Sequence, residues 1–254
     1  MARVFMLFGI LGICLYHTKR WPLRRWDSPH QRELLKIGAP AAGQMTMEVG
    51  VFALATTLSG RLSPPDTAAH QLALNLSAMT FMVPMGISAS AAVLVGQSLG
   101  RGEPHKGIHQ GWIALKAGFI YNFLTCLLFT FFPLALLSFY TTDSATLAVG
   151  QKIMVVAAFF QLADGCQCIS TGALRGLAHT RLPMIANAVG HWFVGLPLGL
   201  SLCFWLGYGL VGLWVGLATG LVVVAVWLLW FWSLKAREFE PNPNEATSRS
   251  SALG

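Results

Sequence analysis

The sequence predicts an all-α membrane protein, a polytopic bundle of about six transmembrane helices. Of its 254 residues, 55% are hydrophobic and only 11% are charged, and the mean hydropathy is +0.60, well above that of a soluble domain. The apolar residues also fall into long runs, which glycine, proline and charged residues separate. Long apolar runs of this kind are typical of helices that cross a lipid bilayer.

The first apolar run lies within residues 1–16 and is short for a membrane-spanning helix. At about 1.5 Å per residue it covers only about 22 Å of a hydrocarbon layer roughly 30 Å thick. No small-residue cleavage site follows it, as a signal peptide would require, and residues 17–34 are rich in Lys and Arg. We therefore expect a transmembrane helix whose start is missing, then a basic cytoplasmic loop, so Met1 need not be the natural start.

Five longer apolar segments follow within residues 35–235. They are expected at approximately 35–58, 69–99, 107–137, 147–174 and 182–232, the last divided into two helices near 206–209. The polar, proline-bearing residues 236–254 are expected to form a disordered cytoplasmic tail. Lys and Arg concentrate in alternate connections and near the C-terminus, which predicts that the loop at 17–34 and the C-terminus are cytoplasmic.

Charge and motifs argue against two other classes of protein. The formal net charge is +7, but the basic residues lie in short connections and not on one face with exposed aromatic residues, so no nucleic-acid partner is expected. The sequence has no nucleophile elbow, no phosphate-binding glycine loop before a lysine, and no metal-ligand spacing among its five cysteines. We therefore expect neither an enzyme nor a bound cofactor.

Two acidic residues lie in the middle of apolar segments, whereas the other acids fall in loops, flanks or the tail. Glu48 and Asp164 are each about 11 to 13 residues from the flanking basic residues, or about 16–20 Å along a helix. A charge at this depth costs roughly 2.5–3.5 kcal/mol on insertion scales, and no Lys or Arg lies between the flanking basic residues that could neutralise it. We predict a proton- or cation-binding site at these acids; the alternative is that hydrogen bonds between helices satisfy them.

Further polar side chains lie at helical spacing from the two acids or from one another. They are Gln44 before Glu48, then Gln161, Gln167 and Thr171 around Asp164, then Gln71 with Asn75, and Asn187 with His191. Such groups either join helices by hydrogen bonds or line a hydrated cavity, and the sequence favours neither explanation. His191 belongs to the residue type that titrates near neutral pH, although a lone histidine is more often structural.

Several motifs, in the same order along the chain, resemble the C-terminal half of multidrug and toxic compound extrusion (MATE) transporters. The motifs are Ala68-Ala-His-Gln-Leu-Ala-Leu-Asn-Leu-Ser, Phe81-Met-Val-Pro-Met-Gly, Val95-Gly-Gln-Ser-Leu-Gly-Arg-Gly, Phe160-Gln-Leu-Ala-Asp-Gly, Gly172-Ala-Leu-Arg-Gly and Trp192-Phe-Val-Gly-Leu-Pro-Leu-Gly. The resemblance covers about residues 30–235. It implies one lobe of a twelve-helix transporter: residues 35–235 correspond to the C-terminal lobe, and residues 1–16 to the end of the last helix of the first lobe.

The resemblance also implies a function, the export of organic cations and other drugs in exchange for H+ or Na+. Glu48 and Asp164 match the cation-coupling acids of the family. Phe160 stands where some sodium-coupled members carry a tyrosine whose hydroxyl helps to bind the ion, so this departure weakens the case for Na+ without deciding between the two ions. The candidate substrate-cavity residues are Gln44, Gln71, Asn75, Phe160, Gln161 and His191.

The expected partners are membrane lipid, small organic cations and an N-terminal lobe that this chain lacks. In the family the substrate path lies between the lobes, so this chain alone would form only one side of that path. Two alternatives remain open. One is a lipid-linked precursor flippase of similar architecture, which would need a basic cavity where this chain has acids. The other is a membrane fragment without transport of its own.

Overall fold

The computed structural model describes residues 9, 12, 13 and 16 and the continuous range 28–239. The expected first helix and the expected tail beyond residue 239 lie largely outside the described residues. The described part consists of helices and their connections, without a strand, which confirms the all-α class. Residues 1–38 and 39–254 form two separate units, and the bundle discussed below belongs to the second.

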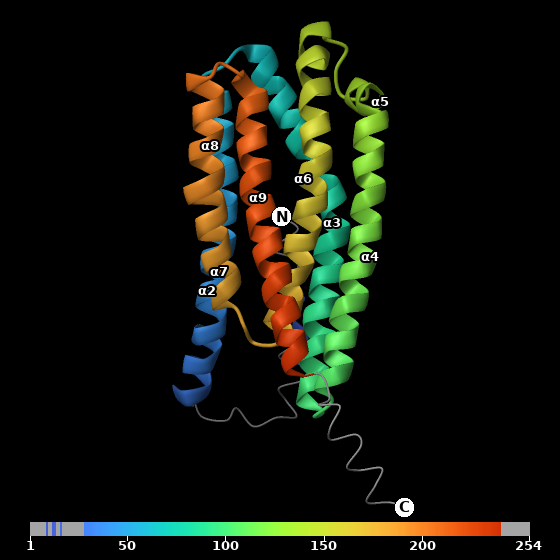
Figure 1. Cartoon of the computed structure of the whole chain (residues 1–254), viewed down its shortest axis with the longest axis vertical. Coiled ribbons are helices and arrows are strands. Elements are labelled where there is room, and N and C mark those ends of the chain that lie inside the picture. Colours follow the sequence, from blue (N-terminus) through green and yellow to red (C-terminus); the bar gives the residue numbers. More distant parts are fainter. Residues whose placement is uncertain (1–8, 10–11, 14–15, 17–27, 240–254) are drawn as a thin grey trace, which may run out of the picture. The chain divides into compact units, whose positions relative to one another are not determined.

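Long helical runs make up the described range (Figure 1). They are α2 (Ser28–Ser59), α3 (Pro64–Gly100), α4 (Pro104–Phe131) followed by the short α5 (Pro133–Ser138), α6 (Ser144–Gly176), a run of α7 (Arg181–Asn187), η1 (Ala188–Gly195), α8 (Leu196–Leu200) and η2 (Ser201–Trp205), and α9 (Gly209–Glu238). The expected break near residues 206–209 is confirmed. Helix α2 begins before residue 35, and α9 continues past residue 235, where Lys235 Nζ lies 2.8 Å from Glu238 Oε1 and supports the last turn.

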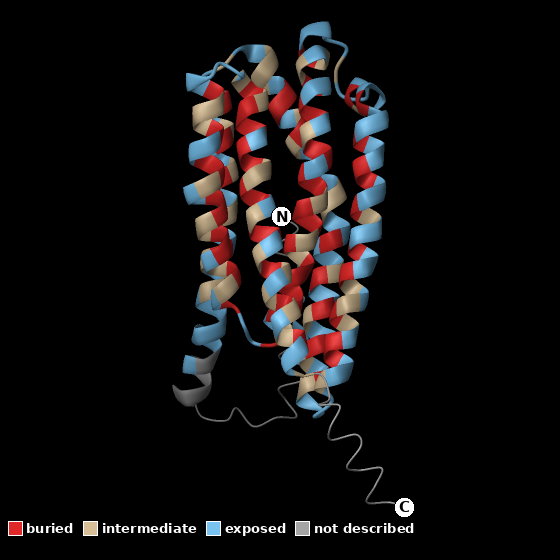
Figure 2. Ribbon diagram, viewed as in Figure 1, coloured by how far each residue is buried: buried red, intermediate tan, exposed pale blue. Residues whose placement is uncertain are grey.

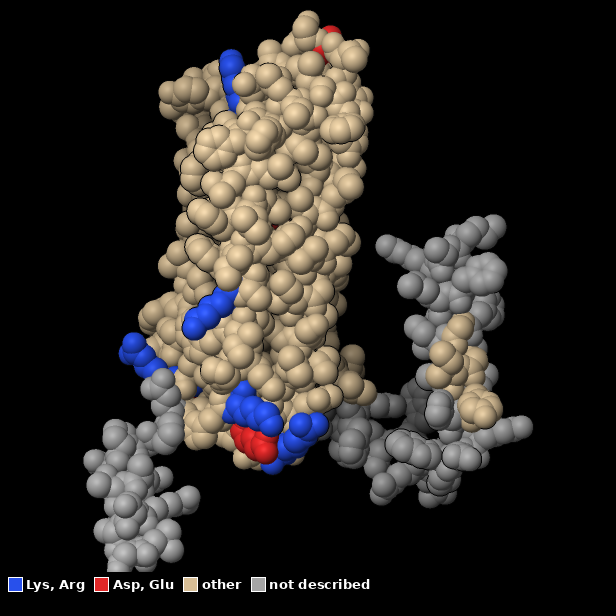
Figure 3. All heavy atoms as spheres, turned by 90° about the vertical axis from the view of Figure 1, so that its right-hand side faces the viewer, with Lys and Arg blue, Asp and Glu red and all other residues tan. Residues whose placement is uncertain are grey.

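Five helical runs of the described part are long and apolar enough to cross a membrane, namely α3, α4, α6, Arg181–Trp205 and α9. The chain is therefore an integral, multi-pass membrane protein. Helix α2 has sufficient length but is not among the five, because Gln44, Thr46 and Glu48 interrupt its apolar sequence. Figure 3 shows that the charged side chains on one face gather towards its two ends, with a broad and almost uncharged band between them.

Helix α6 lies at the centre of the bundle, where it packs against α3, α4 and α9. Figure 2 shows that the buried residues gather on the helix faces that point towards one another. Small residues permit these close contacts: a Cβ atom on Gly172 of α6 would lie 2.2 Å from the carbonyl oxygen of Ser88 on α3. The side chain of Ser88 donates a hydrogen bond of 2.7 Å to the carbonyl of Cys168, across the same contact.

The run from Arg181 to Trp205 contains two segments of π-helix, which the sequence analysis did not predict. In η1 the Leu196 N–H donates to the carbonyl of His191, and in η2 the Leu206 N–H donates to that of Ser201, five residues earlier in each case. Pro197 lies between the two segments and has no N–H to continue an α-helical pattern. The widened turns therefore accompany the proline, and His191 lies in the first of them.

The acids at the starts of α3 and α6 act as helix caps. Asp66 accepts from the backbone N–H of Ser63 at 3.2 Å, and Ser63 Oγ in turn accepts from the N–H of Asp66, which completes a capping box. The carboxylate of Asp143 accepts from the hydroxyl of Thr146 at 2.6 Å and from its N–H at 2.9 Å, and these bonds hold the pKa of Asp143 below its ordinary value. These two acids thus have structural roles at the starts of their helices.

Candidate functional site

Two side-chain contacts fix the level at which α2 and α6 face each other. Gln44 Nε2 lies 3.5 Å from the hydroxyl oxygen of Thr171. The rings of Phe52 and Phe160 pack edge to face, with centroids 5.9 Å apart. Rising residue numbers on α2 therefore meet falling numbers on α6, so the two helices are antiparallel.

This register places the two predicted coupling acids at the same level. Glu48 lies one helical turn before Phe52, and Asp164 lies one turn after Phe160, so both acids are on the same side of the aromatic contact. Their carboxyl groups are close enough to interact electrostatically. Asp164 is only 9% exposed and Glu48 is half-buried. The structure therefore brings together two acids that are 116 positions apart in the sequence (164 − 48).

The acid pair has no basic partner among residues 28–239. Among the residues of this range whose side chains the structure describes, the salt bridges join Lys106 to Glu103 and Lys235 to Glu238, each at a helix end. No hydrogen bond within the same range satisfies the carboxyl groups of Glu48 and Asp164. Two carboxyl groups removed from water and close together cannot both stay charged at low cost. The arrangement therefore favours the binding of a proton or a small cation.

Phe160 forms an apolar wall one turn from Asp164. Its ring is 3% exposed and contacts the ring of Trp214 edge to face at 5.8 Å, in addition to that of Phe52. Gln44 is buried as well and lies one turn from Glu48 on the side away from Phe52. The acids thus lie between an aromatic cluster on one side and an amide with a hydroxyl on the other.

Three other predicted cavity residues lie apart from this pair. Gln161 is buried and donates from its amide nitrogen to the hydroxyl of Thr80, so it joins α6 to α3. Gln71 and Asn75 are exposed on α3. The Asn75 amide donates a hydrogen bond of 2.9 Å to the backbone carbonyl of Gln71 on its own helix. Neither Gln71 nor Asn75 contacts the acids.

His191, the sixth predicted cavity residue, is fully buried in η1. Its ring lies 6.3 Å, centroid to centroid, from that of Phe52 on α2. Neither ring nitrogen has a hydrogen-bond partner among the described residues. His191 therefore does not reach the surface of the described bundle, and its two ring nitrogens are buried without a described partner.

A second buried histidine, His70 on α3, was not identified from the sequence. The indole N–H of Trp214 donates to its Nδ1 at 3.1 Å, and its Nε2 lies 3.0 Å from the hydroxyl of Thr56. Since Nδ1 accepts, the neutral ring carries its proton on Nε2 and donates to Thr56, which donates in turn to the carbonyl of Phe52 at 2.9 Å. His70 thus connects α3, α9 and α2, and its partner Thr56 lies two helical turns after Glu48 on α2. The sequence feature that could have identified His70 is a histidine within an otherwise apolar helix.

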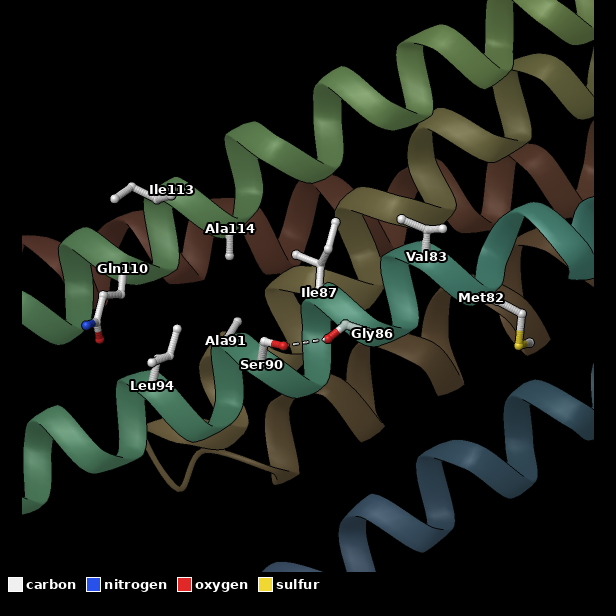
Figure 4. A pocket seen from close by; sticks show the side chains of 10 residues that line it. All are labelled: Met82, Val83, Gly86, Ile87, Ser90, Ala91, Leu94, Gln110, Ile113 and Ala114. Atoms are coloured by element: carbon white, nitrogen blue, oxygen red, sulfur yellow. Dashed lines mark hydrogen bonds between the residues drawn. The ribbon is translucent and has the colours of Figure 1, made fainter.

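A separate groove of about 560 Å³ lies between α3 and α4 (Figure 4). Apolar side chains such as Met82 and Leu94 on α3 and Ile113 on α4 line it, with Gln110 as a polar member. The amide oxygen of Gln110 accepts from Ser98 at 2.9 Å. The groove contains none of the predicted site residues, so the acid pair remains the candidate site.

Comparison with known proteins gives a consistent result. The MatE family model matches residues 40–200. The chain is 38% identical over 252 residues to a probable multidrug resistance protein NorM of Mesorhizobium japonicum, covering 95% of the chain and 54% of that protein. It is 41% identical over 213 residues to the multidrug resistance protein NorM of Burkholderia vietnamiensis, covering 82% of the chain and 46% of that protein. The chain thus spans about half the length of the curated relatives it matches.

Solved structures share the fold at lower identity. The Vibrio cholerae MATE transporter VcmN in the bent form matches 92% of the chain and 54% of its own length, with a TM-score of 0.77 and 19% identity. The eukaryotic MATE transporter AtDTX14 matches 85% of the chain and 50% of its own length, with a TM-score of 0.74 and 19% identity. These solved structures therefore share the helical arrangement described above.

Proposed function

The chain belongs to the MATE family, and on this premise we propose that it forms one lobe of a multidrug efflux antiporter, which exports organic cations in exchange for H+ or Na+. The observation that carries the proposal is the acid pair, Glu48 on α2 and Asp164 on α6, at one level and without a basic partner among the described residues. The names of the NorM relatives support multidrug export as the activity of the whole protein.

The geometry suggests how ion binding can act on conformation. When the site is empty and both acids are charged, they repel each other across α2 and α6, whereas a bound proton or Na+ removes that repulsion. Polar contacts between α2 and the other helices include the weak one of 3.5 Å from Gln44 and the bond of 3.2 Å from the Trp192 indole N–H to the carbonyl of Met47. Ion binding would therefore favour one position of α2, and drug binding the other, so that each ligand shifts the same equilibrium.

Export should be tested with both lobes present, because the substrate path needs walls from each. We would co-produce this chain with the N-terminal lobe of the Mesorhizobium japonicum NorM relative, reconstitute the pair in liposomes, and measure the efflux of a cationic dye. We expect dye export under an imposed H+ or Na+ gradient, and none without a gradient; the gradient that drives export identifies the ion. If both lobes are present as a complex and neither gradient drives export, the proposed function is wrong.

We further propose that the C-terminus and the loop at 17–34 lie in the cytoplasm. The end of the bundle that carries the C-terminus of α9 also carries most basic residues of the connections and helix ends, namely Arg101, Lys106, Arg175, Arg181, Lys235 and Arg237. Arg61 and Lys152 lie towards the other end. A C-terminal fusion to green fluorescent protein in a Gram-negative host should fluoresce, and a fusion to alkaline phosphatase should be inactive. The reverse pair of results would overturn this orientation.

A further inference from the structure

Five residues on four helices form a closed network of contacts. In order around the network they are His70, Trp214, Phe160, Phe52 and Thr56, and each contacts the next. Helices α3, α9 and α6 contribute one residue each, and α2 contributes the last two. We call this set the His70 network.

The imidazole of His70 forms the polar half of the network. Its Nδ1 accepts from the indole N–H of Trp214 at 3.1 Å, and its Nε2 lies 3.0 Å from the hydroxyl of Thr56. An indole only donates, so the neutral imidazole accepts at Nδ1 and donates from Nε2. The Thr56 hydroxyl continues the chain of hydrogen bonds by donating to the carbonyl of Phe52 at 2.9 Å. The position of His70 thus requires one side chain that both accepts and donates.

Aromatic rings form the other half. The ring of Trp214 contacts that of Phe160 with centroids 5.8 Å apart, and Phe160 contacts Phe52 at 5.9 Å. Both contacts are edge to face, a geometry that aromatic pairs prefer. Trp214 is 0% exposed and Phe160 3%, so neither ring has free space around it. A shift of either neighbour therefore moves the ring of Phe160 as well.

The two phenylalanines connect the network to the candidate site. Phe52 lies one turn after Glu48 on α2, and Phe160 lies one turn before Asp164 on α6. His70 thus acts on the two acids by separate routes. One route runs through the hydroxyl of α2 and the other through the indole of α9.

The contact with His70 is also a comparatively short polar attachment of α2. Its length of 3.0 Å compares with two longer contacts nearer to Glu48. The Gln44 amide lies 3.5 Å from its hydroxyl partner on α6, and the carbonyl of Met47 accepts from the η1 segment at 3.2 Å. The position of α2 beside α6 therefore depends on the hydrogen bond of Thr56 with His70.

We propose that His70 is a positioning residue for the acid pair. Its two hydrogen bonds hold the contact between the two phenylalanines in place, and this contact fixes the separation of the two carboxyl groups. A binding site needs its groups held close to one geometry by the residues around them. The inference rests on the proposed role of the acids as an ion site, and it adds the residue that sets the geometry of that site.

The test measures ion binding by the chain itself, without a transport assay. The chain is held in liposomes on an infrared crystal, buffer with rising Na+ or H+ is passed over it, and the carboxyl bands are recorded. The band changes that Asp164→Asn and Glu48→Gln remove belong to the acid pair. The ion concentration at half of the maximal change gives the affinity of the site, which a merely structural loss of stability does not alter.

His70→Leu removes both hydrogen bonds and keeps a side chain of similar bulk. We expect the ion concentration at half-maximal change to rise about 10-fold, the size expected when one or two hydrogen bonds no longer hold the site. His70→Gln should stay within about threefold of the parent, because an amide both accepts and donates. Ser98→Ala is the control: it removes a buried hydrogen bond of 2.9 Å to Gln110, between α3 and α4, and should leave the half-maximal concentration unchanged.

A matched pair of threonines tests the route through α2, and it applies even if His70→Leu does not fold. Thr56→Val keeps the shape of the side chain but removes the hydroxyl that His70 contacts, so it should raise the half-maximal concentration about 3- to 10-fold. Thr57 is the exposed neighbour, and its hydroxyl donates to the carbonyl of Ala53 at 2.9 Å. Thr57→Val loses an equivalent bond within α2 and should bind the ion like the parent.

The outcomes separate this inference from the proposed function. If the parent binds an ion at the acid pair, and Thr56→Val and every folded His70 variant bind it equally well, His70 is structural only and the ion site stands. A shift in His70→Gln as large as that in His70→Leu would overturn the role of the hydrogen bonds. If neither ion changes the carboxyl bands of the parent, the ion site and the positioning role are both wrong.

Discussion

Replacing Asp164 by Asn, or Glu48 by Gln, in the two-lobe transporter is expected to abolish ion-driven export and leave the bundle folded. The amides have nearly the same size as the acids, but they do not titrate near neutral pH and carry no charge to attract a cation. Neither carboxyl group has a salt bridge within the described residues that the substitution would break. Removing one of two interacting buried carboxyls also relieves desolvation and repulsion, so the temperature of unfolding should stay the same or rise.

The measurement is efflux of a cationic dye under the gradient that drives the parent protein, with thermal unfolding of the same preparations. Glu103→Gln is the control, because Glu103 lies in an exposed connection, 3.3 Å from Lys106, and should export at the parent rate. Parent-rate export by both Asp164→Asn and Glu48→Gln would rule out the coupling role. A loss of export together with a loss of folding would mean that the acids are structural instead.

The position of each acid within a long helix could be predicted from the sequence, but their pairing could not. Counting residues to the flanking basic residues was enough to place Glu48 and Asp164 in the middle of their segments. Which residues of α2 face which residues of α6 depends on tertiary contacts, namely the Phe52 to Phe160 ring contact and the contact of Gln44 with Thr171. Helical spacing within one segment contains no information about that register.

The polar residues of α3 show a second limit. Gln71 with Asn75 and Gln44 with Glu48 have the same spacing of four residues, yet Gln71 and Asn75 are exposed while Gln44 is buried. In a soluble helix the apolar stripe would indicate the inner face, but α3 is apolar on all sides, as a membrane helix is. His70, next to Gln71 in the sequence, is the residue that points inwards. The sequence offered no means to choose between these neighbours.

Gly216→Ala is expected to destabilise the bundle by about 1–3 kcal/mol or more, because it forces two backbones apart. A Cβ atom at Gly216 of α9 would lie 2.2 Å from both Cα and N of Gly199 on α8. Backbone atoms cannot rotate away as a flexible side chain can, so the helices must separate. Gly212 and Gly220, four residues to either side, make similar approaches to Leu202 and to Gly190, which makes this a continuous small-residue contact.

Gly86→Ala provides the matched comparison, since Gly86 lies within α3 and a Cβ atom there meets nothing within 4 Å. Alanine has the higher helix propensity by roughly 0.8–1 kcal/mol in water, so this variant should unfold at the parent temperature or above it. Thermal unfolding of the Gly216→Ala and Gly86→Ala proteins in one detergent distinguishes the two variants. A Gly216→Ala protein as stable as the parent would contradict the backbone contact. Because these glycine contacts hold η1 against α9, and Gly190 of η1 directly precedes His191, the same substitution should also displace the His191 ring from its buried position beside Phe52.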